Sequence, residues 1–150
     1  MGWVIFLAIV AAIVVLIVLG VKKKKRKEAE GIEELKNSGV YRLVLKIMDE
    51  LEKNGYTSNG SPTLEYDYRA YGTVGCYRDK GKGQGVHIWF SLYNIGSQRH
   101  WILVSNRYGI ESDNINIFVS SEPARDMPEP VAIAAKVIDD SGNGPCKRVQ

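Results

Sequence analysis

The stretch VHIWFSLYNIGSQRHWILVS, residues 86–105, decides the fold of the chain that follows the apolar N-terminus. Both halves alternate between two kinds of side chain, and this period of two is typical of β-strands. Gly96-Ser97 lies between the halves and suits a two-residue hairpin turn. With that turn, Tyr93 lies opposite His100 and Trp89 lies opposite Val104. The sequence therefore predicts an antiparallel hairpin with a defined pairing.

The two faces of this hairpin differ in character. The face predicted to be core is wholly apolar and carries Val86, Ile88, Phe90, Leu92, Trp101 and Leu103. The other, which we call the mixed face, carries His87, Trp89, Ser91, Tyr93, His100, Ile102 and Val104. A surface of this composition is too apolar for ordinary exposure and too polar for a plain core. The favoured interpretation is that this face is covered by a helix or by the Pro-rich segment that contains Pro123, Pro128 and Pro130.

The alternative interpretation is that the mixed face is exposed and docks a partner or a small ligand. Its contact residues would be His87, Trp89, Tyr93, His100 and Ile102.

A helix is predicted ahead of the sheet. Its apolar stripe has the spacing of one helical face and consists of Val40, Leu43, Val44, Ile47, Met48 and Leu51. Either Asn37 or Ser38 suits the N-cap, and Gly55 suits the C-terminal exit. The apolar side of this helix requires a partner, and the sheet is the predicted one.

Other elements are predicted on either side of the hairpin. Strands are expected at residues 64–71, 74–78 and 115–119, and a helix beginning near Pro130 at residues 131–138. The glycine-rich residues 79–85 are predicted to be a loop. Glycine motifs that bind the phosphates of dinucleotides are followed by a helix, whereas a strand is predicted after these glycines. A helix, four or five antiparallel strands and a second helix define an α+β domain.

Residues 1–21 contain no charged side chain. As an α-helix they would be about 31 Å long, which matches the hydrocarbon core of a bilayer. A cleavable signal peptide needs a basic N-terminal region and a shorter apolar run, and neither is present. The segment is therefore predicted to be a single-pass transmembrane helix of the signal-anchor kind.

A polybasic run follows this helix directly and consists of Lys22, Lys23, Lys24, Lys25, Arg26 and Lys27. Basic residues beside a span are retained in the cytoplasm, so the N-terminus is predicted to lie outside the cell membrane and the rest inside. The run is also expected to contact anionic lipid head groups, at about 1 kcal/mol per residue before screening. From Glu28 onward there are 14 basic and 17 acidic residues, which disfavours nucleic-acid binding.

Residue types that carry catalysis or bind metals are few. His87 and His100 occupy opposite ends of the hairpin, too far apart to share a metal ion. Cys76 and Cys146 lack metal-ligand spacing, and a structural zinc ion needs about four ligands. We expect free thiols in a reducing compartment, with no metal, no cofactor and no recognisable catalytic residue.

The predicted organisation is a transmembrane helix at 1–21, a polybasic juxtamembrane segment and linker at 22–37, a cytoplasmic α+β domain at 38–140 and a flexible tail at 141–150. Residues 28–37 also suit a continuation of the transmembrane helix. The expected function is a membrane-anchored binding or adaptor module with an unidentified protein partner. The alternative is a small membrane-tethered hydrolase whose active site the sequence does not reveal, and the lack of a catalytic motif favours a non-enzyme.

Overall fold

The computed structural model describes residues 2–79, 84–107, 114–122, 132–135 and 147–148. Its elements are α1 (Gly2–Lys36), α2 (Gly39–Lys53), β1 (Thr57–Ser58), β2 (Thr63–Asp67), β3 (Arg69–Asp79), β4 (Gln84–Ile95), β5 (Gln98–Arg107), β6 (Asn114–Glu122) and β7 (Lys147–Arg148). Residues 80–83 of the predicted loop lie outside the described residues, whereas Asp79 ends β3, and Gln84 and Gly85 begin β4. Residues 131 and 136–138 of the predicted helix and most of the predicted tail also lie outside them.

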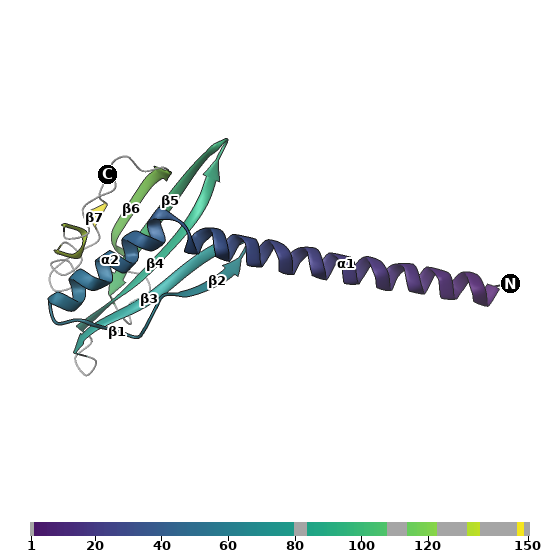
Figure 1. Ribbon diagram of the computed structural model, residues 1–150, viewed down its shortest axis with the longest axis horizontal. Coiled ribbons are helices and arrows are strands. Elements are labelled where there is room, and N and C mark those ends of the chain that lie inside the picture. The colour runs from purple at the N-terminus through teal and green to yellow at the C-terminus, as the bar shows by residue number, and fades with distance from the viewer. Residues whose placement is uncertain (1, 80–83, 108–113, 123–131, 136–146, 149–150) are drawn as a thin grey trace.

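The strands form one sheet, in the order β1-β3-β4-β5-β6-β7, with β2 also paired to β3. All pairings from β1 to β6 are antiparallel, and β7 pairs with β6 in parallel. Residues 147–148 thus form a short strand within a segment predicted to be a flexible tail. Helix α2 lies across one face of the sheet (Figure 1). The predicted α+β class is confirmed, and we call α2, the sheet and the last turns of α1 the head.

Helix α2 forms as its sequence predicts. Ser38 is the N-cap, where its hydroxyl accepts a 3.2 Å hydrogen bond from the Tyr41 amide and donates a 2.6 Å bond to the Leu35 carbonyl. Gly55 has a φ of +85° just beyond the C-cap, a conformation that favours glycine. Five of the six residues of the predicted stripe are buried, and the sixth, Met48, is half-buried. The buried ones are Val40, Leu43, Val44, Ile47 and Leu51.

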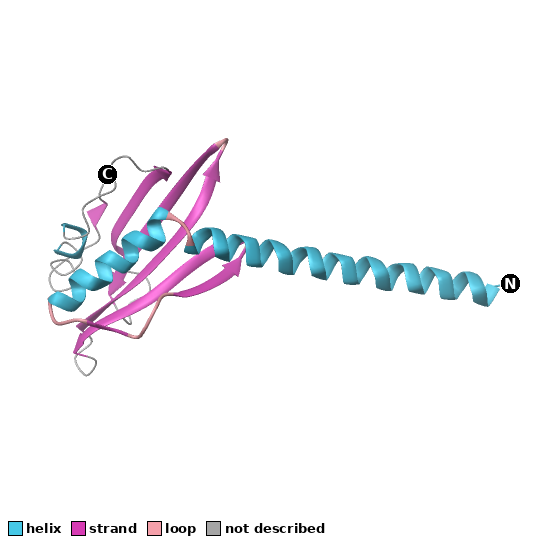
Figure 2. Ribbon diagram, in the orientation of Figure 1, coloured by secondary structure: helices cyan, strands magenta, loops and turns pink. Residues whose placement is uncertain are grey.

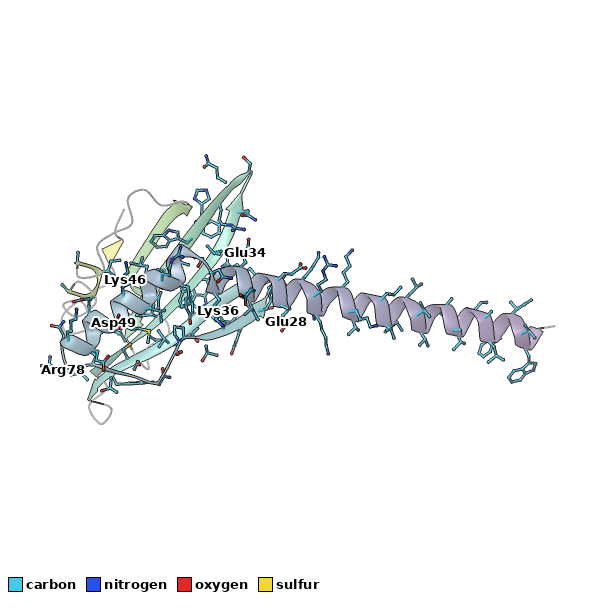
Figure 3. The ribbon with its side chains drawn as sticks, in the orientation of Figure 1. Glu28, Glu34, Lys36, Lys46, Asp49 and Arg78 are labelled. Atoms are coloured by element: carbon cyan, nitrogen blue, oxygen red, sulfur yellow. The ribbon has the colours of Figure 1, made fainter. Side chains whose placement is uncertain are left out.

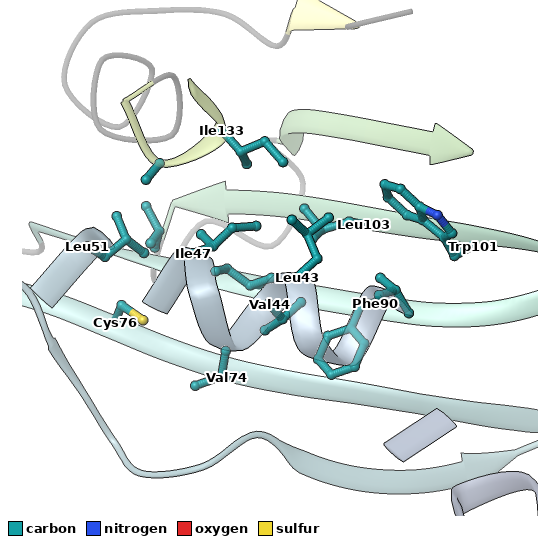
Figure 4. Close-up of a cluster of buried hydrophobic side chains, with 14 of the residues drawn as sticks. Leu43, Val44, Ile47, Leu51, Val74, Cys76, Phe90, Trp101, Leu103 and Ile133 are labelled. Atoms are coloured by element: carbon teal, nitrogen blue, oxygen red, sulfur yellow. The ribbon is translucent and has the colours of Figure 1, made fainter. Parts of the chain in front are cut away.

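The β4–β5 hairpin has the predicted pairing, with Tyr93 opposite His100 and Trp89 opposite Val104. Its apolar face packs under α2, where Phe90, Trp101 and Leu103 are completely buried (Figure 4). Ile133 and Ala134, from the helical residues 132–135, join the same core. Burial of this apolar area is the main stabilising term of the head.

The single strand predicted at residues 64–71 is wrong, because the chain reverses direction within it. Tyr68 has a φ of +60° and separates β2 from β3, which then pair antiparallel with Asp67 opposite Arg69. The predicted strand at 74–78 is the continuation of β3.

Helix α1 runs without a break from the apolar segment into the head (Figure 2). Residues 28–36 are therefore helical, which agrees with the continuation and not with an irregular linker. Leu35 is completely buried and Ile32 packs against the core. Gly31 allows the close approach, because a Cβ there would lie 3.0 Å from the Tyr66 ring. The core of the head thus begins upstream of Ser38.

Candidate functional site

The mixed face of the sheet is turned away from α2. All five residues of the predicted partner surface, His87, Trp89, Tyr93, His100 and Ile102, lie on it and are half-buried. In the described part of the chain no helix covers the mixed face, because α1, α2 and residues 132–135 all contribute to the core on the opposite face. Most of the Pro-rich segment lies outside the described residues.

Contacts along the mixed face explain its partial burial. The Tyr71 and Trp89 rings stack at 6.1 Å between centroids, and the Arg69 guanidinium carbon lies 5.5 Å from the centroid of the Trp89 ring. Tyr93 stacks on His100 at 5.6 Å. The rings therefore cover one another, and each still presents part of its surface to solvent.

The predicted chemistry-bearing residues are not brought together. His87 is paired with Asn106 and His100 with Tyr93, near opposite ends of the hairpin. Among the described residues, no group of three His, Cys, Asp or Glu side chains is placed to hold a metal ion. Cys76 is buried in the core, and this burial raises the pKa of its thiol to about 11. Cys76 is thus a thiol at neutral pH and not a nucleophile, while Cys146 lies outside the described residues.

A groove lies where α1 joins the sheet. It has a volume of about 840 Å³ and is open on one side. Its lining comes from α1 (Lys27, Glu30, Gly31 and Glu34), the β2–β3 corner (Tyr66, Tyr68, Arg69 and Ala70) and the end of β4 (Leu92, Tyr93 and Asn94). We call this hollow the junction groove. It adjoins the mixed face through Arg69 and Tyr93.

The carboxylates of the junction groove are paired with arginines that do not line it. Glu30 forms a 2.7 Å ion pair with Arg26 one turn back along α1, and this contact raises the pKa of the Arg26 guanidinium. Glu34 forms an ion pair with Arg99 of β5. Figure 3 shows Glu34 on the last turns of α1, beside the sheet.

The polybasic run is exposed on α1, just after the apolar residues. A smaller hollow of about 410 Å³ is lined by Lys22, Lys23, Arg26, Lys27 and Glu30. No residue in the apolar part of α1 is buried, and the helix has the length and composition needed to cross a membrane. A signal sequence near an N-terminus satisfies the same two criteria.

Sequence reasoning missed the junction groove and its residues Tyr66, Tyr68 and Arg69. The signal was the tyrosine-rich run of residues 64–71, which was assigned to one continuous strand. Comparison with family models, with curated proteins and with solved structures gives no match. The class of protein is therefore defined by the structure alone: a small α+β head on the end of a long, exposed apolar helix.

Proposed function

We propose that this chain is a single-pass membrane protein with its N-terminus outside the cell and its head in the cytoplasm. The head serves there as a binding or adaptor module for a protein partner. The observation that carries the proposal is the continuity of α1, whose exposed apolar residues lead directly into turns packed in the core.

Physical chemistry supports the membrane placement. About 20 apolar side chains exposed along one helix are unfavourable in water, and a bilayer removes them from it. The basic run at residues 22–27 favours a cytoplasmic head, because such residues resist translocation. The burial of Leu35 at the end of the same helix then holds the head close to the membrane surface.

Cysteine labelling of full-length protein in intact cells tests the orientation. In a Cys146→Ser background, Ser97→Cys places a thiol in the exposed β4–β5 turn of the head, and Gly2→Cys places a thiol at the first residue of α1. The buried Cys76 gives little background. We expect a membrane-impermeant maleimide to label Gly2→Cys in intact cells and Ser97→Cys only after permeabilisation. External labelling of Ser97→Cys would contradict the cytoplasmic placement.

The basic run provides a second test of orientation. Replacing residues 22–27 with neutral residues in the Ser97→Cys protein should give mixed orientation, because the N-terminal flank then has no basic competitor. A fraction of the cysteine would become accessible from outside. Unchanged labelling would show that another feature sets the topology.

The mixed face is the proposed docking surface for the partner. Aromatic anchors dominate interface energetics, and the half-buried Trp89 is the largest of them on this face. Trp89→Ala should therefore abolish affinity capture of the partner by full-length protein from membranes. Its matched control is Phe90→Ala, on the opposite face of the same strand, which removes a completely buried ring.

Stability measurements distinguish an exposed mixed face, available for docking, from one that is covered by another part of the chain. Phe90→Ala should cost about 3–5 kcal/mol of unfolding free energy, and Trp89→Ala clearly less. Equal large losses would show that the mixed face is covered. A folded Trp89→Ala protein that still captures the same partner would refute docking at this tryptophan.

A further inference from the structure

We infer that the junction groove binds the phosphate of an anionic phospholipid, with Lys27 and Arg69 as the charged contacts. The inference rests on the proposed membrane placement and deepens it, because it assigns the head a specific lipid site. General attraction of the basic run to an anionic surface requires no such site.

The charge balance of the groove favours an anion. Both of its carboxylates are already neutralised, Glu30 by Arg26 and Glu34 by Arg99. Within the described part of the chain, Lys27 and Arg69 form no ion pair with a carboxylate. Asp67 lies opposite Arg69 in the β2–β3 register without forming an ion pair with it. The groove therefore presents two basic side chains that make no direct ion pair within the described part of the chain, and an anionic ligand would supply one.

Arg69 is held in place without using its hydrogen-bonding capacity. Its guanidinium lies over the Trp89 ring, a cation–π contact that restrains the side chain while its N–H groups stay available. A planar guanidinium matches two oxygens of a phosphate, and such charge-assisted pairs are stronger than neutral hydrogen bonds. Neutral donors around the same hollow are Tyr66, Tyr68, Tyr93 and Asn94.

The depth of the groove relative to the bilayer favours a lipid. Lys27 follows Val21, the last apolar residue of the run, by about 9 Å along the helix axis. The head-group layer of one leaflet is about 5–8 Å thick. Lysine side chains on a helix tilt toward its N-terminus, which here is the side of the membrane, and they extend along apolar surface toward polar groups. The phosphate of a lipid in the bilayer can thus reach the Lys27 end of the groove.

The β2–β3 corner lies at the end of the head from which α1 leaves (Figure 1). Tyr68 at this corner is 94 % exposed and has a φ of +60°. The left-handed conformation is unfavourable for a residue with a Cβ, and a glycine would adopt it without strain. Strain of this kind is typical of functional sites, and tyrosine is enriched at the level of lipid head groups. We infer that Tyr68 lies against the lipid head group.

Full-length protein in neutral detergent micelles is titrated with short-chain phosphatidylglycerol, short-chain phosphatidylcholine or inorganic phosphate, and native mass spectrometry counts the bound molecules. We expect one phosphatidylglycerol per chain. Arg69→Gln and Lys27→Gln should each weaken this binding about tenfold. Tyr68→Gly should also weaken it, without lowering the denaturation midpoint.

Two matched controls separate the groove from general electrostatics. Lys25→Gln removes the same charge closer to the span, at a residue that lines neither hollow. Arg78→Gln removes an arginine at the other end of β3, far from the junction with α1 (Figure 3). Each should change the affinity less than twofold. Equal effects of Lys25→Gln and Lys27→Gln, or of Arg78→Gln and Arg69→Gln, would overturn the inference.

Comparison of the three titrated ligands tests the source of the phosphate. Binding of phosphatidylcholine as tight as that of phosphatidylglycerol would overturn selection of an anion, and equal binding of inorganic phosphate would overturn the lipid assignment. The micelle titration does not depend on orientation in the cell. A head labelled from outside would therefore refute the proposed function while the groove result still stood.

Discussion

Among the described glycines, Gly72 of β3 is the one where an added Cβ would make the closest contact. A Cβ at this residue would lie 2.2 Å from Cζ of Phe90 and 2.7 Å from two further ring atoms. The Phe90 ring is completely buried and also makes an edge-on contact with Tyr41 of α2 at 6.1 Å between centroids. The ring thus has no free space on the side of the helix into which it could retreat.

The expected cost of Gly72→Ala follows from these contacts. Overpacking a well-packed core costs about 1–3 kcal/mol, and a clash with three atoms of a rigid ring belongs at the upper end. Replacing glycine with alanine also reduces the conformational entropy of the unfolded chain, which stabilises the folded state by about 0.4–1 kcal/mol. We therefore expect a net loss of about 2 kcal/mol in unfolding free energy, measured from denaturant midpoints by near-ultraviolet circular dichroism on full-length protein in micelles.

Gly75 in the same strand is the matched control. A Cβ there would meet the outer end of the half-buried Tyr77 side chain, with the hydroxyl at 2.8 Å and Cζ at 3.1 Å, and not a ring packed in the core. Gly75→Ala should change the unfolding free energy by less than about 0.5 kcal/mol. In a Phe90→Leu background, Gly72→Ala should lose most of its cost, because the ring atoms are gone. Equal losses at the two glycines, or an undiminished loss beside leucine, would refute the reasoning.

Three further predictions concern buried groups. Ser91 donates a 2.7 Å hydrogen bond to the Ala70 carbonyl of β3, whereas the buried Ser105 hydroxyl has no hydrogen-bond partner among the residues that the structure describes. Ser91→Ala should therefore cost about 1 kcal/mol, and Ser105→Ala should not lower the denaturant midpoint. A fragment starting at Glu28 should unfold cooperatively. A fragment starting at Gly39 should be several kcal/mol less stable, because it lacks the buried end of α1. Equal denaturant midpoints of the two fragments would show that the end of α1 does not stabilise the core. Burial raises the pKa of the Cys76 thiol from 9.0 to about 11, so its thiolate fraction at neutral pH is about a hundredfold below that of an ordinary thiol. The neutral thiol is favoured in the folded state, so the stability that it contributes should be lost as the pH rises from about 9 to 11. Stopped-flow thiol titration of the Cys146→Ser protein at neutral pH should show reaction of Cys76 only on unfolding, and fast reaction of this native protein would contradict the burial.

Local patterns in the sequence were sufficient for the elements whose side chains repeat with one period. The stripe and cap of α2, the β4–β5 pairing and the apolar face of that hairpin were all predicted correctly, because each depends on neighbours close in the chain. The junction groove was not predicted. Its three parts, residues 27–34 of α1, the β2–β3 corner and the end of β4, are far apart in the sequence.

The reversal at Tyr68 shows why periodicity has this limit. A strand that turns back symmetrically about one residue keeps its alternation, so Tyr66 and Ala70 share a face whether the chain continues straight or reverses. A period of two therefore cannot distinguish one strand from a tight hairpin. Only tertiary packing decides between them, here through Gly31 of α1, which lies against Tyr66 and Ala70 together.

The charge of the groove was likewise decided by the tertiary structure. The sequence determined that the apolar helix is followed by six basic residues and that the rest of the chain is mildly acidic. It did not determine that Glu34 pairs with Arg99, 65 residues away, or that Arg69 and Lys27 form no ion pair among the described residues. Composition counts charges, whereas a site depends on which of them are neutralised by neighbours, and those neighbours are set by the fold.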